Sequence, residues 1–171
     1  VFPEAFFNEP YFTSQVPNYI NYGSAGEAMA HELFHGLDYT GTLFNHKGIL
    51  NQPFSNSARA HLAKQVNCFH QLLDNSLIEN ITMDGATISM EIDKRITVNE
   101  ILADVGGLWA AYEAYRRHET IHGPEPLLPA LNLTAYQTFF VAAAQPYCAV
   151  IDDLAKIFLM EVDEHLVNDM R

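Results

Sequence analysis

Apolar side chains recur every three or four residues in four stretches of the chain, and this pattern carries most of the predicted secondary structure. Such spacing places the apolar side chains on one face of a helix. We therefore expect four helices, over residues 25–37, 57–73, 98–118 and 135–144. Asn99 is expected to open the third helix and Thr134 to cap the fourth. Pro146 should interrupt the fourth helix, with a continuation over residues 148–160.

The remaining segments predict little regular structure. Residues 1–24 combine prolines with aromatic side chains and should be extended and loop-like, with room for a short strand. Residues 79–96 contain Gly85 among alternating and β-branched residues, which indicates a loop or a short pair of strands. Residues 160–171 are expected to form a loop. The chain has the length of one domain, and the expected fold is mainly α with little β structure.

Composition narrows the range of partners. Nine Lys and Arg residues stand against 21 Asp and Glu residues, a formal charge of -12. This charge disfavours nucleic acid and anionic membrane surfaces, so we expect no nucleic-acid partner and no membrane contact from this segment. No apolar run approaches the roughly 20 residues that a membrane-spanning helix needs. An acidic surface mildly favours cationic substrates or metal ions.

The segment "AHELFHGLDYTG" holds the first chemical signal. His31 and His35 are four residues apart, so on a helix both imidazoles can reach one Zn²⁺. Glu32, next to the first histidine, can serve as the general base toward a zinc-activated water. The alternative is a helix with two satisfied histidines and a solvated glutamate. Polar groups this dense among apolar neighbours would be costly to bury without a metal ion, which favours the zinc site.

A catalytic zinc ion usually has three protein ligands and one open position. No further histidine follows His35 at a suitable spacing, so the third ligand must come from elsewhere. Glu100 is the best candidate, and Asp104 lies one helical turn later on the same face. One carboxylate can bind zinc while the other accepts the spare N–H of a ligating histidine. The pair Gly106–Gly107 would let a second backbone approach closely. Alone, the two carboxylates would indicate an exposed acidic stripe.

Four segments of the chain resemble the neprilysin and endothelin-converting enzyme family of zinc endopeptidases, in order and at suitable spacing. The first is "NYGSAGEAMAHELFHGLDYTGTLFNHKG", which contains the HExxH pattern. The others are "NEILADVGGLWAAYEAY", "LLPALNLTAYQTFFVAAAQPYC" and "VDEHLVNDMR". The resemblance covers essentially the whole chain. It implies a zincin-like fold of the gluzincin, thermolysin-like type, with residues 1–171 forming a single zinc-peptidase catalytic domain that is the C-terminal part of a longer chain.

The resemblance assigns roles residue by residue. It implies one Zn²⁺ per chain, held by His31, His35 and Glu100. Glu32 is the implied base, and Asp104 supports a ligating histidine. Two further roles come from the resemblance alone. His165 matches a histidine that stabilises the oxyanion of the tetrahedral intermediate, with Asp163 placed to orient it. Arg171 matches an arginine that binds a substrate backbone carbonyl.

The resemblance also implies a setting. Family members cut short peptides before a hydrophobic residue and are secreted or are ectodomains of type II membrane proteins. An upstream domain caps their site, and we expect such a domain in the full-length protein. The sequons at Asn80 and Asn132 predict N-glycosylation in an extracellular location.

Some positions depart from the family pattern. Glu27 and Ala28 stand where the family often has apolar residues lining a substrate pocket, and Glu27 could admit a more basic side chain. Cys68 and Cys148 match family cysteines whose partners lie outside this stretch, so we do not expect them to pair with each other. The competing interpretations are a catalytically inactive, peptide-binding homologue and a purely structural helical domain. The intact Glu32 argues against the inactive homologue.

Overall fold

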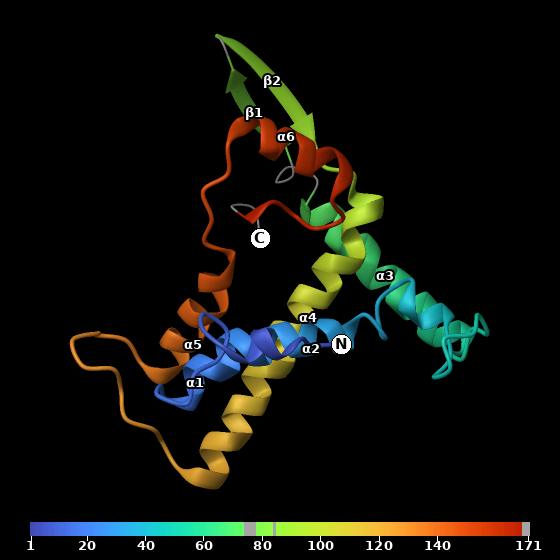
Figure 1. The fold of residues 1–171 in the computed structure, drawn as a ribbon. Helices are drawn as coiled ribbons and strands as arrows, with labels where there is room; N and C mark the ends of the chain where they lie inside the picture. The colour runs from blue at the N-terminus through green and yellow to red at the C-terminus, as the bar shows by residue number, and fades with distance from the viewer. Residues whose placement is uncertain (74–77, 84, 169–171) are drawn as a thin grey trace. The chain divides into compact units, whose positions relative to one another are not determined.

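The computed structural model describes residues 1–73, 78–83 and 85–168, and within them the chain is mainly helical with one β-hairpin (Figure 1). The regular elements are α1 Asn18–Asn21, α2 Glu27–Phe34, α3 Asn56–Leu73, β1 Ile78–Met83, β2 Ala86–Glu91, α4 Lys94–His122, α5 Ala135–Ala144 and α6 Asp153–Val162. Short 3₁₀ helices span Glu4–Phe7, Gly41–Leu43 and Gln145–Tyr147, and a π-helical turn spans Tyr22–Gly26. No helix among these described residues is long and apolar enough to cross a membrane.

The chain divides into two compact units. The first comprises Val1–Phe34 with Ala103–Cys148, and the second comprises His35–Leu102 with the segment from Ala149 onward. Helix α4 therefore supplies its N-terminal part to the second unit and the rest to the first. Each unit has its own buried apolar cluster.

Aromatic side chains dominate the core of the first unit, where α1 and α5 pack together (Figure 1). Tyr19, Tyr115 and Phe139 are fully buried. The Tyr115 ring packs edge-on against Tyr19, with centroids 6.1 Å apart, and parallel to Phe139 at 6.3 Å. Such aromatic pairs contribute roughly 0.5–1.5 kcal/mol beyond their buried area. Because Tyr115 lies on α4, these contacts fix the helix that carries Asp104.

Helices α1 and α2 are joined without a break by the π-helical turn at residues 22–26. The Ser24 hydroxyl lies within hydrogen-bond distance of the Ile20 carbonyl, at 2.9 Å, and of the Tyr11 carbonyl, at 2.6 Å. The wider turn accommodates one more residue than an α-helical turn would. One continuous helical run thus leads from the aromatic core to His31.

In the second unit, α6 packs on the hairpin of β1 and β2 (Figure 1). The strands are antiparallel, with Ile81 opposite Ile88. The buried cluster consists of Ile81, Ile92, Ile101, Met160, Leu166 and Val167. Lys156, which is almost fully buried on α6, places Nζ 2.5 Å from Glu79 Oε1 on β1. This ion pair joins the helix to the strand beside the apolar cluster.

The structure confirms the mainly helical fold and the strand pair. Helix α5 has the expected bounds, and Thr134 caps it by accepting a hydrogen bond from the Gln137 N–H while the Gln137 side chain accepts one from the Thr134 N–H. The cap expected at Asn99 is wrong. Helix α4 begins at Lys94, and the Asp93 carboxylate accepts from the Arg95 N–H.

Other expected bounds also shift. The helix predicted over residues 25–37 is part of a helical run that begins at Asn18 and ends at Phe34. The N-terminal segment predicted to be extended contains a 3₁₀ helix and α1, and no strand among its described residues. Residues 148–152 are not helical, and α6 continues to Val162 in a segment predicted as loop.

Candidate metal centre

In the first unit, His31 on α2 is buried against α4. Its Nδ1 lies 2.8 Å from Asp104 Oδ1. The close approach depends on Gly107, since a Cβ atom there would lie 2.6 Å from the His31 backbone nitrogen. At Gly106 a side chain would overlap the Phe34 ring. The glycine pair therefore has the role predicted from sequence, and it brings together two predicted site residues that are 73 positions apart.

Glu27 also belongs to the polar group around His31. It lies one helical turn before His31, is 4% exposed, and accepts a hydrogen bond from the Tyr147 hydroxyl at 3.1 Å. Glu27, His31 and Asp104 each offer a ligand-type atom, and these three atoms lie within 4.8 Å of one another. Sequence reasoning considered Glu27 only as a pocket residue and missed this cluster. The four-residue spacing from His31 was the available signal.

Glu32 follows His31 on α2, and its side chain is exposed to solvent. A general base must exchange its proton with water and with a departing group, so solvent access at this position suits that role.

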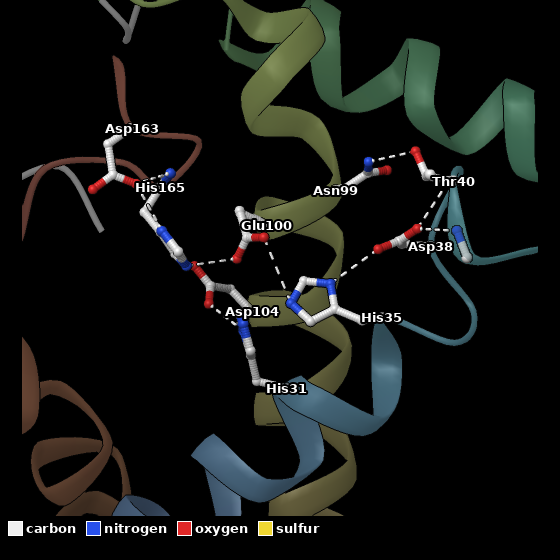
Figure 2. A network of polar contacts seen from close by, with 10 residues as sticks. His31, His35, Asp38, Thr40, Asn99, Glu100, Asp104, Asp163 and His165 are labelled. Atoms are coloured by element: carbon white, nitrogen blue, oxygen red, sulfur yellow. Dashed lines mark hydrogen bonds and ion pairs between the residues drawn. The ribbon is translucent and has the colours of Figure 1, made fainter. Parts of the chain in front are cut away.

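In the second unit, His35 lies between two carboxylates (Figure 2). Its Nδ1 is 2.9 Å from Asp38 Oδ2, and its Nε2 is 3.5 Å from Glu100 Oε1 on α4. The other Asp38 oxygen accepts from the backbone N–H groups of Thr40 and Gly41, at 2.8 and 2.7 Å. Asp38 is thus held by the turn that follows α2. Asp38 lies within the first segment that resembles the family, but its contact with His35 was not predicted.

His165 approaches the same carboxylate from the C-terminal segment (Figure 2). Its Nε2 lies 3.0 Å from Glu100 Oε2, and its Nδ1 lies 2.8 Å from Asp163 Oδ1. The backbone N–H of His165 also donates to Asp163 Oδ1, at 2.9 Å. A cavity of about 240 Å³ adjoins this ring and is lined by Leu159, Asp163, His165, Leu166, Val167 and Asn168. The expected support of His165 by Asp163 therefore has a direct geometric basis.

The residues of the second unit fit a zinc ion. Bonds of about 2.0–2.1 Å in a tetrahedral site place neighbouring ligand atoms roughly 3.3 Å apart. The 3.5 Å between His35 Nε2 and Glu100 Oε1 is close to this separation. The Glu100 side chain is only 7% exposed, and a carboxylate buried to that degree requires a cation or hydrogen-bond donors. An imidazole nitrogen and a carboxylate oxygen are both ordinary zinc ligands.

The other predicted positions are less informative. Arg171 lies outside the described residues. Asn80 on β1 and Asn132 before α5 are both exposed, as glycosylated asparagines must be. Cys68 and Cys148 are exposed and not disulfide-bonded.

Comparison with known proteins gives the family to which this fold and its histidine–carboxylate groups belong. A sequence profile described as "Peptidase family M13" matches residues 1–171, so the chain belongs to that family. The resemblance to neprilysin and the endothelin-converting enzymes is thereby confirmed.

Individual relatives are considerably longer than this chain. Neprilysin-2 from Caenorhabditis elegans is 29% identical over 171 residues, which are 100% of this chain and 22% of that protein. Endothelin-converting enzyme 1 from Rattus norvegicus is 35% identical over 150 residues, 88% of this chain and 18% of that enzyme.

Solved structures support the fold. The zinc metalloprotease Zmp1 of Mycobacterium tuberculosis, in complex with an inhibitor, matches with a TM-score of 0.82 at 24% identity. The match covers 98% of this chain and 25% of that protein. The Haemonchus galactose-containing glycoprotein complex matches with a TM-score of 0.81 at 25% identity, over 99% of this chain and 27% of that chain.

Proposed function

We propose that this chain carries the catalytic centre of a zinc-dependent endopeptidase that hydrolyses short peptides. The observation that carries the proposal is the pairing of each HExxH histidine with a carboxylate through Nδ1, at 2.8 Å for His31 with Asp104 and 2.9 Å for His35 with Asp38. A carboxylate at Nδ1 fixes the tautomer whose lone pair is on Nε2. Both imidazoles are therefore oriented to ligate a metal ion through Nε2.

His31, His35 and Glu100 would hold one Zn²⁺ per chain, leaving a fourth position for water or substrate. A zinc ion bound there would polarise the peptide carbonyl and lower the pKa of a water molecule toward about 7. Asp104 and Asp38 would orient the two imidazoles, and the removal of such partners typically weakens metal binding.

The remaining side chains would handle protons and charge. Glu32 would take the proton of the attacking water and pass it to the leaving amine. His165, held by Asp163, would donate a hydrogen bond to the oxyanion that forms on the carbonyl. A positioned donor of this kind typically lowers the barrier by a few kcal/mol. Arg171 would bind a substrate backbone carbonyl.

The setting is also part of the proposal. The chain matches about a fifth of each curated relative described above, which supports an upstream domain that limits access to the site. We place the protein outside the cell, as a secreted enzyme or a type II ectodomain, with glycans on the exposed Asn80 and Asn132. The single catalytic domain over residues 1–171 remains a prediction of the same kind.

The test is peptide hydrolysis by Glu32→Gln beside a measurement of bound zinc. We expect the variant to keep its zinc and to lose turnover by about 10²–10⁴-fold, the usual contribution of a general base. Glu161→Gln, which neutralises an exposed carboxylate on α6, is the matched control and should cut at the parental rate. Turnover by Glu32→Gln equal to that of the parent would disprove the base assignment. A parent that binds zinc and peptides but cuts none would be the inactive homologue.

A further inference from the structure

A second HExxH sequence occurs near the end of α4. Residues 118–122 read His-Glu-Thr-Ile-His, so His118 and His122 have the same spacing as His31 and His35. Their rings are already close, with centroids 4.5 Å apart. His118 is partly buried and His122 is exposed. Both belong to the first unit and to the last turns of one helix.

This second pair lacks the parts of a hydrolytic centre. The Glu119 carboxylate accepts a short hydrogen bond from the Tyr136 hydroxyl. The same bond raises the pKa of Tyr136 above its usual value, as expected beside a charged carboxylate. Glu119 is therefore held by a neighbour on α5. Among residues 1–73, 78–83 and 85–168, no cluster of three ligand-type side chains includes either histidine.

The surroundings of the pair nevertheless favour a cation. Asn18 Nδ2 lies 3.4 Å from His118 Nε2 and 2.9 Å from Glu125 Oε1, so the Asn18 amide links the first ring to a carboxylate. The second oxygen, Glu125 Oε2, is buried and has no hydrogen-bond partner within the described part of the chain. The negative end of the α4 dipole adds to this preference, since the helix ends at His122.

Neighbouring rings hold His118 in place. The Tyr22 ring is 5.5 Å away and the Tyr115 ring is 6.4 Å away, measured between centroids. Packing thus holds one of the two imidazoles in place, whereas the other, that of His122, is exposed to solvent.

We propose that His118 and His122 form a second metal site, for Cu²⁺, Ni²⁺ or Zn²⁺, separate from the candidate catalytic centre. Two imidazoles one helical turn apart bind such borderline ions, and Cu²⁺ binds most tightly in the usual order of affinities. Water completes the coordination, and the Glu125 carboxylate offsets part of the ion's charge. The bound ion clamps the last turn of α4. The site does not depend on the proposed peptidase activity.

The test is a titration of the metal-free protein with Cu²⁺ and with Zn²⁺, in which calorimetry measures binding and electron paramagnetic resonance reports the ligands of bound Cu²⁺. We expect the parent protein to bind a second ion more weakly than the first. His122→Gln should lower the affinity for that second ion by about tenfold or more and remove the signal of one coordinated nitrogen from the Cu²⁺ spectrum. His61→Gln, which replaces an exposed helical histidine on α3, should change neither reading.

Two further variants separate the sites. His35→Gln should abolish the tighter zinc-binding step and leave the weaker one, whereas Glu125→Gln should lower only the affinity for the second ion. If the peptidase proposal is wrong, only the tighter zinc-binding step should be missing from the titration. If His122→Gln binds the second ion as the parent does, or if His61→Gln loses it equally, the proposed site is wrong. His122 is exposed, and an unchanged circular dichroism spectrum would show that its replacement preserves the fold.

Discussion

At Asp38, the two carboxylate oxygens have different partners. Oδ1 accepts hydrogen bonds from the backbone N–H groups of Thr40 and Gly41, and Oδ2 faces His35 Nδ1. The residue thus couples the turn after α2 to the orientation of a proposed zinc ligand. Because it is buried, removing it leaves two backbone donors and one imidazole without their acceptor.

Asp38→Ala should therefore lower both stability and zinc affinity. We expect a loss of about 1–3 kcal/mol in the free energy of unfolding, from the unsatisfied donors. Zinc affinity should fall by about 10–100-fold because the His35 ring loses its orienting carboxylate. Chelator competition measures the affinity, and urea unfolding of the metal-free protein measures the stability.

Asn45→Ala is the matched control for Asp38→Ala. Its side-chain oxygen accepts from the N–H groups of Lys47 and Ile49, so the substitution breaks a turn without touching a histidine. This variant should lose some stability and keep its zinc affinity. Parental zinc affinity in Asp38→Ala would contradict the orienting role.

The sequence revealed two of the supporting contacts, those of Asp104 and Asp163, but not that of Asp38. The four-residue spacings of His31 with His35 and of Glu100 with Asp104 match helix periodicity, so a pattern of residue types reveals them. The contact of Asp38 with His35 depends instead on the helix ending at Phe34, three residues before the predicted end. The second HExxH sequence at 118–122 shows the limit of the pattern, since only the structure reveals that Glu119 is held by Tyr136.

At the scale of elements, the contact between α2 and α4 depends on the absence of a side chain at Gly107. A Cβ atom there would lie 2.6 Å from the backbone nitrogen of His31 and 2.8 Å from its Cα. Backbone atoms cannot move aside as a flexible side chain can, so the two helices would have to separate.

Gly107→Ala should destabilise the fold by about 1–3 kcal/mol, as overpacked cores typically do. It should also weaken zinc binding, because the shift moves His31 away from Asp104. Gly26→Ala is the control. A Cβ there would meet its nearest atom at 3.5 Å, and alanine favours a helix by up to about 1 kcal/mol. Thermal unfolding with zinc titration checks both variants, and equal stability of the two would refute the steric argument.

Element boundaries were predictable where a cap is local. Thr134 and Gln137 form a reciprocal cap within four residues, so the start of α5 could be derived from sequence. The start of α4 could not. Asn99 looked like a capping residue, but the chain had already entered the helix through Asp93, whose carboxylate also binds the Arg95 guanidinium. The pairing of α2 with α4 was anticipated from the ligand set predicted for one zinc ion and from the missing bulk at Gly106–Gly107.

For the whole molecule, the formal charge of -12 is the dominant electrostatic feature. Such a charge attracts cationic solutes over distances of about a Debye length, roughly 8–10 Å at physiological salt. The proposed peptidase should therefore capture basic peptides faster than neutral ones, through the association rate rather than through chemistry.

This predicts a difference in salt dependence. Between about 0.01 and 0.15 M salt, where the Debye length falls from about 30 to 8 Å, kcat/KM for a basic peptide should drop severalfold. A neutral peptide of equal length should change little, and kcat should be unaffected for both. Steady-state kinetics on the two peptides provide the measurement. Parallel salt curves for the basic and neutral peptides would show that the net charge does not steer substrates.

The division into two units was not predictable from composition. Both clusters are apolar, and α4 contributes Ile101 to one and Tyr115 to the other. No linker, break in periodicity or change in charge marks the boundary within the helix. The sequence therefore predicts a continuous helix correctly, but it does not reveal that the two parts of this helix pack into two different apolar clusters.

The π-helical turn at residues 22–26 sets the angular phase between the two ends of the helical run from Asn18 to Phe34. Each residue added or deleted in a helix rotates everything beyond it by about 100°. Because the wide π-helical turn absorbs one extra residue, a chain lacking Ala25 should close it to an ordinary α-helical turn and keep the first imidazole of the HExxH segment facing its carboxylate. The stretch should instead be sensitive to substitution at Gly23, because a Cβ atom there would lie 2.4 Å from the Phe139 carbonyl oxygen on α5.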